Sequence, residues 1–339
     1  MARAQSRKQS KSGDAAEIDR AGELLRAGRL VAFPTETVYG LGANALDEAA
    51  VARIYAVKGR PSTSPLIVHV ASVEMARSLV ANWREAAERL ARQFWPGPLT
   101  LVLEKRLAVA GVASDTIPDI VTAGLDTVGV RMPAHPVALA LIRAAGVPLA
   151  APSANRFSGL SPTMAEHVRV DLGSDVDLII DGGPCEVGIE STVLSLVGRR
   201  ATLLRPGGIS RAQMEAIVGP IAAAQEVQAG AHPSPGMHPR HYSPRTNLYL
   251  VTNGDTIDGW LDLGRGTGIY LQHRHPLKHR QAGITIRQMP QAAGDYAAQL
   301  YDVLHRADEG NYDWIAIDLP PSEPEWEAIH DRLKRAATK

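Results

Sequence analysis

A proline-rich segment interrupts this sequence after Gly219. Between His232 and Pro244 it contains four prolines and three histidines. Proline fixes φ and removes a backbone donor, so neither a helix nor an interior strand is expected to run through this segment. In the extended polyproline form it would rise about 3.1 Å per residue, enough to cross the face of a domain. The sequence therefore predicts two folded parts joined by an extended linker over residues 220–245.

Short apolar runs alternate with helical stretches through the first part, residues 14–219. Asp14 and Glu17 have the spacing of a helix-capping box, and Gly28 is a typical stop signal for the helix between them. This alternation predicts an α/β domain built on a large mixed sheet. The predicted strands are 30–33, 66–70, 99–103, 127–132, 149–151, 178–180, 192–197 and 202–204, and further helices are predicted at 49–57, 73–80, 85–94, 136–145, 163–172 and 210–218.

The second part, residues 246–339, repeats this alternation on a smaller scale and predicts a small α/β domain. Its predicted strands are 248–251, 268–271, 284–287 and 314–319, and its predicted helices are 294–307 and 323–337. Residues 1–13 contain only basic charges and no apolar stretch long enough for a signal peptide or a membrane span. We expect a disordered basic tail there and no membrane contact.

Composition excludes several classes of protein. Lys and Arg number 36, as do Asp and Glu, so no global positive charge attracts nucleic acid. Cys185 is the only cysteine, which excludes a disulfide framework and a cysteine zinc cluster and fits a reducing, cytoplasmic location. Neither a Walker-type phosphate loop nor an H-E-x-x-H zinc motif is present. His273, His275 and His279 could form a metal cluster, but the cations beside them oppose metal binding and favour a solvated basic loop, so no metal site is expected.

Polar residues cluster where the predicted strands end, which is where open α/β sheets build their sites. Lys58 and Arg60 lie in a proline-braced loop that suits a polyanion, although a plain surface loop would look alike. Arg131 lies within an apolar strand and needs an anion, either a structural partner or a ligand carboxylate. Residues 150–163 carry hydroxyls ahead of a helix, for phosphate binding or for capping. Together these groups favour an anionic substrate.

Five motifs, in this order and spacing, resemble the YrdC-like family of L-threonylcarbamoyladenylate synthases in its long, two-domain form. The motifs are P-T-E-T-V-Y-G-L-G at 34–42, K-G-R-P at 58–61 with P-L-I-V-H at 65–69, S-A-N at 153–155 with S-G at 158–159, S-T-V at 191–193 and R-P-G at 205–207. The resemblance implies a YrdC-like twisted mixed sheet with helices and a smaller Rossmann-like C-terminal α/β domain. It also implies a nucleotidyltransferase that makes threonylcarbamoyl-AMP and pyrophosphate from L-threonine, bicarbonate or CO2, and ATP, for threonylcarbamoyladenosine modification of tRNA.

The resemblance also assigns roles to residues and partners. Mg2+ would accompany ATP, and the product would pass to tRNA threonylcarbamoyl-transfer proteins, with tRNA contact a further expectation. Lys58 and Arg60 would be the catalytic pair. Many family members have Asn where Ser64 stands. The threonine-binding residues would be Thr37, His69, Arg131 and Ser191, and the ATP-binding residues Lys58, Arg60, Ser64, Thr127, Ala151, Ser153, Asn155, Ser161, Arg205 and Tyr242.

Two rival functions and one open question accompany this interpretation. A non-catalytic double-stranded RNA or tRNA-binding module with the same fold would not need Thr37, His69, Arg131 and Ser191 together. A carbamoyltransferase of hydrogenase maturation would carry zinc-finger cysteines, which a single cysteine cannot supply. We further predict that the linker lies over the site with Tyr242 near the nucleotide; the alternative is a passive spacer.

Overall fold

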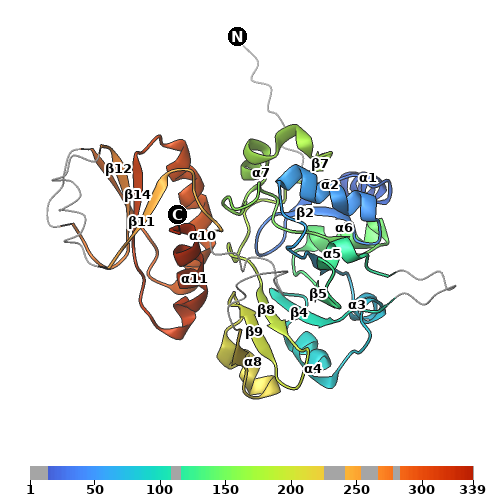
Figure 1. Ribbon diagram of the computed structural model, residues 1–339. Coiled ribbons are helices and arrows are strands. Elements are labelled where there is room, and N and C mark those ends of the chain that lie inside the picture. The colour runs from blue at the N-terminus through green and yellow to red at the C-terminus, as the bar shows by residue number, and fades with distance from the viewer. Residues whose placement is uncertain (1–13, 108–115, 225–240, 253–265, 278–282, 339) are drawn as a thin grey trace, which may run out of the picture.

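A ten-stranded mixed sheet forms the centre of the first part of the chain (Figure 1). The computed structural model describes residues 14–107, 116–224, 241–252, 266–277 and 283–338. The sheet order is β10-β9-β8-β4-β5-β3-β6-β2-β1-β7. Its strands are β1 (Val31–Phe33), β2 (Gly40–Asn44), β3 (Ile67–His69), β4 (Leu99–Glu104), β5 (Thr127–Arg131), β6 (Leu149–Ala150), β7 (Leu178–Ile179), β8 (Thr192–Ser195), β9 (Thr202–Arg205) and β10 (Ala222–Ala223). The predicted mixed sheet is thus confirmed.

Helices cover this sheet with apolar faces. Asp14 caps the first helix by accepting a hydrogen bond from the Glu17 amide at 2.8 Å, as the spacing of the two residues predicts. α1 and α6 pack together over one apolar cluster, and the larger apolar core includes residues of α2 and α4. The helices are α1 (Ala15–Arg26), α2 (Glu48–Lys58), α3 (Val73–Leu79), α4 (Glu85–Phe94), α5 (Asp119–Thr122), α6 (Pro136–Ala145), α7 (Ala165–Asp171) and α8 (Arg211–Val218).

Strand β2 was missed by the sequence pattern, and the reason is its glycines. Its sequence, G-L-G-A-N, has few residues that favour strands. Yet β2 pairs with β1 in antiparallel fashion, and a Cβ at Gly42 would lie 2.8 Å from the Phe33 ring. Tertiary packing therefore requires a small residue where propensity argues against a strand.

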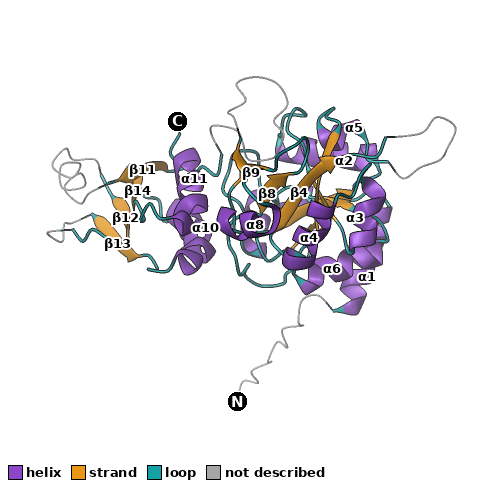
Figure 2. Ribbon diagram, turned by 90° about the horizontal axis from the view of Figure 1, so that it is seen from below, coloured by secondary structure: helices purple, strands orange, loops and turns teal. Residues whose placement is uncertain are grey.

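The second part of the chain forms a four-stranded sheet in which every pairing is parallel. The strand order is β11-β14-β12-β13. Helices α10 and α11 lie between this sheet and the first domain in both views (Figures 1 and 2). The elements are β11 (Asn247–Val251), β12 (Gly268–Gln272), β13 (Ile284–Gln288), α10 (Ala293–Glu309), β14 (Trp314–Asp318) and α11 (Glu327–Ala336). Such a layer of helix on parallel sheet fits the predicted Rossmann-like domain.

The two parts share an apolar core. Val38, Leu160 and Ile189 of the first part belong to the same buried cluster as Leu300 and Tyr301 of α10. The first sheet also extends to β10, inside the segment that we assigned to the linker, because β10 pairs with β9 in parallel. Linker residues 225–240 lie outside the described residues. Among the described helices, none combines the length and apolar character that a membrane span requires.

Candidate active site

His69 and Arg131 stand side by side at the ends of two neighbouring strands. β3 and β5 are parallel, and their register places His69 opposite Arg131. Both side chains are buried and line one cavity. Burial, reinforced by the Arg131 cation, lowers the pKa of His69 to about 3, so the imidazole is neutral near pH 7. The pair presents a fixed cation beside a neutral hydrogen-bonding group.

Arg131 has a protein carboxylate as its partner. Its Nη2 lies 2.8 Å from Oε1 of Glu36, and its Nε donates to the Gly97 carbonyl at 3.3 Å. Neither oxygen of Glu36 has a well-aligned hydrogen bond among the described residues, although both side chains are buried. The structural ion pair that we left open for Arg131 therefore exists, and a ligand carboxylate at Arg131 would share the guanidinium with Glu36.

Ser191 and Arg205 join two motif segments at the cavity wall. Nη2 of Arg205 donates to Oγ of Ser191 at 3.1 Å, and its Nε donates to the Ser191 carbonyl, also at 3.1 Å. The Ser191 hydroxyl also lies 2.8 Å from Oγ1 of Thr100. A Cβ at Gly207 would meet the backbone nitrogen of Thr192 at 2.3 Å, so the R-P-G segment approaches this strand only with glycine.

The first motif folds as a hydroxyl-stabilised turn. Oγ1 of Thr35 donates to the Val38 carbonyl at 2.7 Å and lies 2.8 Å from Oγ1 of Thr37. Thr37 is fully buried, and both threonines line the cavity. Local side-chain bonds of this kind compete with regular structure, which explains the turn between β1 and β2.

The two loop cations have different positions. Nη2 of Arg60 donates to Oγ of Ser64 at 2.5 Å and to the Pro65 carbonyl at 3.0 Å, and this side chain lines the cavity. Burial lowers the pKa of Arg60 to about 10. Lys58 lies behind the wall, where its amine donates to the carbonyls of Ser153, at 2.6 Å, and Asn155. Burial and the Arg60 cation hold the pKa of Lys58 well below its ordinary value.

Tyr242 fills one side of the cavity although it belongs to the linker. Its φ is +61°, and its side chain is buried. The Tyr242 ring lies 5.1 Å from the guanidinium of Arg332 and 5.9 Å from the ring of Tyr301. The Tyr242 hydroxyl has no hydrogen-bond partner among the described residues. The Ser243 amide donates to the Ser158 carbonyl at 2.9 Å, which fixes this segment to the first domain.

The structure brings most predicted site residues to one cavity. Ser64 and Lys58 bond residues of the wall, as does Ser161, which donates to Glu190. Asn155 lies behind the wall with Lys58, and Thr127 lines a small adjoining hollow that shares Ile67 with the cavity. The predicted residues that line the cavity itself are Thr37, Arg60, His69, Arg131, Ala151, Ser153, Ser191, Arg205 and Tyr242.

Sequence reasoning missed four polar groups of this site and one neighbour. Thr35, Glu190 and His241 line the cavity, and Glu36 pairs with Arg131 beside it. Glu36 lies inside one of the five motifs and Glu190 lies directly before another. A carboxylate near the end of a predicted strand was the sequence signal that could have identified them as site residues. Arg332 contacts Glu190 although the two residues are 142 positions apart in the sequence. No local sequence pattern predicts this contact.

Among the described residues, no group of three His, Cys, Asp or Glu side chains is placed to hold a metal ion. Both carboxylates at the site are paired, Glu36 with Arg131 and Glu190 with Arg332. The described part of the site can therefore neutralise and orient an anion.

Family comparisons match both parts of the chain. A family model described as "Telomere recombination" matches residues 23–207, and one described as "Threonylcarbamoyl-AMP synthase, C-terminal domain" matches residues 209–338. A protein of Bacillus subtilis named threonylcarbamoyl-AMP synthase is 42% identical over 334 residues, covering 95% of this chain and 93% of its own length. A Pyrococcus abyssi protein of the same name is 49% identical over 231 residues, covering 67% and 66%.

Solved structures agree with this match. The crystal structure of Pyrococcus abyssi Sua5 complexed with L-threonine is similar with a TM-score of 0.86 and 38% identity, covering 96% of this chain and 95% of that one. A variant of the same protein with two alanine substitutions gives a TM-score of 0.85 at 37% identity, covering 96% and 93%.

Proposed function

This chain belongs to the threonylcarbamoyl-AMP synthase family, and on that premise we propose that its cavity joins L-threonine, CO2 or bicarbonate, and ATP into threonylcarbamoyl-AMP and pyrophosphate. The enzyme is a nucleotidyltransferase that serves tRNA modification. What carries the detailed proposal is one juxtaposition: Arg60, Arg131 and Arg205 line a single cavity together with the hydroxyls of Thr37 and Ser191. Three guanidinium groups suit a substrate pair with one carboxylate and three phosphates.

We assign the threonine end of the cavity to the ends of β3 and β5. Arg131 would bind the substrate carboxylate, with Thr37, His69 and Ser191 around the amine and hydroxyl. The relative crystallised with L-threonine supports this assignment through its overall likeness to the chain. Because His69 is neutral, it can accept or donate a hydrogen bond without adding charge.

The nucleotide end is assigned to Arg60, Arg205 and Tyr242. Arg60 is braced by three hydrogen bonds to its own loop, so its charge stays aimed when phosphates arrive. Lys58 supports the loop that carries Ser153. We propose that Mg2+ would accompany ATP and would offset phosphate charge; Glu36 and Glu190 are already paired with arginines, so neither would be its ligand.

The reaction needs two bond-forming steps. The neutral threonine amine adds to CO2 and releases a proton to water, giving a carbamate. A carbamate oxygen then attacks the α-phosphorus of ATP, and the α–β phosphoanhydride bond breaks as pyrophosphate leaves. Neither step demands a strong acid or base; both demand orientation and charge neutralisation, which the described groups offer. The mixed anhydride product would pass to the proteins that load it on tRNA, in the reducing cytoplasm that a single buried Cys185 suits.

Pyrophosphate release tests this proposal. The full-length chain is assayed with ATP and Mg2+, adding threonine and bicarbonate separately and together. We expect release only with both. Pyrophosphate release at the same rate with and without threonine would contradict the threonine site. If the protein releases no pyrophosphate under any condition but binds double-stranded RNA, the RNA-binding alternative would be favoured.

A further inference from the structure

Glu190 places a carboxylate at the wall of a cavity that we assign to anionic substrates. It precedes Ser191 in the chain, and its side chain is only 8% exposed. The carboxylate accepts hydrogen bonds from Ser161 and from the hydroxyl of Tyr301, the latter at 3.1 Å. Neither donor cancels its charge, so by themselves they would leave a negative group beside the substrates.

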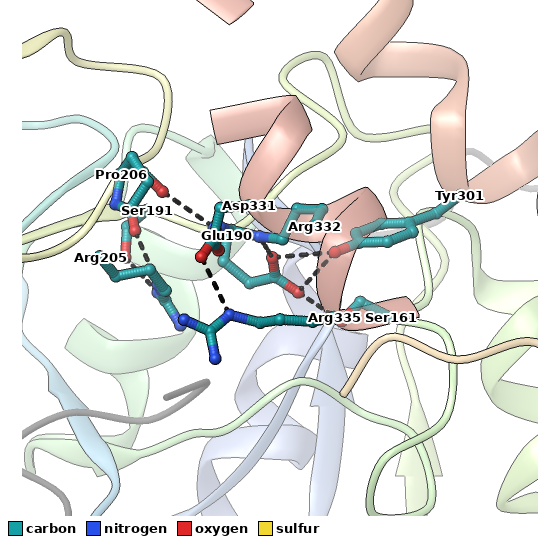
Figure 3. A network of polar contacts seen from close by, with 9 residues as sticks. All are labelled: Ser161, Glu190, Ser191, Arg205, Pro206, Tyr301, Asp331, Arg332 and Arg335. Carbon is teal, nitrogen blue, oxygen red and sulfur yellow. Dashed lines mark hydrogen bonds and ion pairs between the residues drawn. The ribbon is translucent and has the colours of Figure 1, made fainter. Parts of the chain in front are cut away.

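The neutralising cation comes from the C-terminal domain. Nε of Arg332, on α11, donates to Oε2 of Glu190 at 2.8 Å, and the Arg332 side chain is fully buried (Figure 3). Burial acts to raise the pKa of Glu190, yet Arg332, Arg205 and the Ser161 hydroxyl hold that pKa below its ordinary value. Glu190 is thus ionised and paired, and the pair spans the two domains.

Arg332 also connects the two motif segments that carry Ser191 and Arg205. Its Nη2 donates to the carbonyl of Pro206 at 3.0 Å, while its Nε binds Glu190. Asp331 accepts from the remaining Nη1 at 2.6 Å, which fixes the plane of the guanidinium. The planar fork of one arginine therefore fixes the residue before Ser191 and the residue after Arg205.

We propose that Arg332 is a positioning residue of the synthase: from the second domain, it cancels the Glu190 charge at the cavity wall so that ATP can bind beside Arg205. This inference rests on the proposed function for the identity of the anion. Removing the Arg332 guanidinium would weaken ATP binding because the buried Glu190 carboxylate is then uncompensated, and not because side-chain volume is missing. That distinction makes the inference testable.

A double-mutant cycle separates charge from packing. The four full-length proteins are the wild type, Arg332→Met, Glu190→Gln and the double variant, each measured for KM of ATP, kcat and melting temperature. We expect Arg332→Met to raise the KM of ATP at least about tenfold, with a smaller change in kcat. Glu190→Gln in that background should restore most of the loss, because the amide keeps the shape and removes the charge. Arg306→Met is the matched control, since Arg306, on α10, pairs only with Asp302 among the described residues and is 59% exposed.

Each outcome decides the matter. A double variant as impaired as Arg332→Met would overturn the proposal, as would an unchanged KM in Arg332→Met. Should Arg332→Met fail to fold, the double variant should fold, and failure of both would also overturn it. A wild type that makes no threonylcarbamoyl-AMP would instead defeat the proposed function, which keeps the two failures distinct.

Discussion

Individual side chains at this site are held by the protein before any substrate arrives. Arg60 is bonded to its own loop, Arg131 to Glu36, and Arg205 to Ser191. Such bonds cost some affinity, since a ligand must share each guanidinium, but they remove the need to order long side chains on binding. The site is thus organised for orientation rather than for proton transfer.

Replacing Arg60 with Ala should lower kcat/KM for ATP about 100-fold, as is typical when one preorganised charge is removed from a transition state. Arg53→Ala is the control, because Arg53 lies on α2, close in sequence, but pairs with Asp177 at the surface. Steady-state kinetics with both variants, beside thermal melts, provide the measurement. Equal kinetics in the two variants would show that Arg60 has no phosphate role.

The neutral state of His69 gives a pH prediction. Its pKa of about 3 in the folded chain lies below the ordinary 6.5, so between these values the unfolded chain binds more protons than the folded chain. The stability that depends on a neutral His69 is complete above pH 6.5 and is lost as pH falls toward 3. Denaturant unfolding at pH 7.5 and 5 should show this loss, and His69→Gln should show a smaller one. An imidazole resonance of His69 that titrates near pH 6.5 would contradict the prediction.

At the scale of elements, helix α10 approaches the site very closely. Gly188 has a φ of +74°, and a Cβ there would lie 2.4 Å from Cα of Ala298, on α10. This contact lies two residues before Glu190, so the docking of α10 and the position of the cavity wall are coupled. Only glycine satisfies both the backbone conformation and the close approach.

Gly188→Ala should therefore lower the free energy of unfolding by more than backbone strain alone would. Gly183→Ala is the matched control, because Gly183 has a φ of +83° and a Cβ added there would meet no atom within 4 Å. We expect the control to lose about 1–2 kcal/mol of unfolding free energy and Gly188→Ala clearly more, together with a higher KM for ATP. Equal losses of unfolding free energy in the two variants would mean that α10 can move away from the added methyl group without loss of stability.

Tyr242 lies in the part of the linker that the structure describes, and its hydroxyl is the group to test. Tyr242→Phe should weaken ATP binding about tenfold without lowering the melting temperature, because the deleted hydroxyl has no partner among the described residues. Tyr296→Phe is the control: its hydroxyl is likewise buried and unpartnered among those residues, but Tyr296 belongs to α10 and does not line the cavity. Calorimetric ATP titration of both variants checks this, and an unchanged Kd for Tyr242→Phe would leave the linker as a spacer.

For the whole molecule, sequence reasoning succeeded where a local hydropathy pattern predicts the element, but it missed the short helix α5 and the short strand β10. Apolar runs ending in polar clusters predicted β3 and β5, and their parallel register then brought His69 to Arg131. Strand β2 was not predicted because its glycines have low strand propensity. They are required for packing against Phe33. The ion pair of Glu190 with Arg332 was not predicted for a different reason, because it joins two domains. Neither hydropathy nor residue spacing predicts which buried charges meet across an interface.

The fate of labelled carbon tests the central claim most directly. The full-length chain is incubated with 13C-bicarbonate, threonine, ATP and Mg2+, and the products are followed by mass spectrometry beside pyrophosphate release. We predict one labelled threonylcarbamoyl-AMP for each pyrophosphate, and a lower kcat/KM with serine, because the missing methyl costs about 1–3 kcal/mol of binding. Pyrophosphate released without incorporation of the label, or equal kinetics with serine and threonine, would contradict the account.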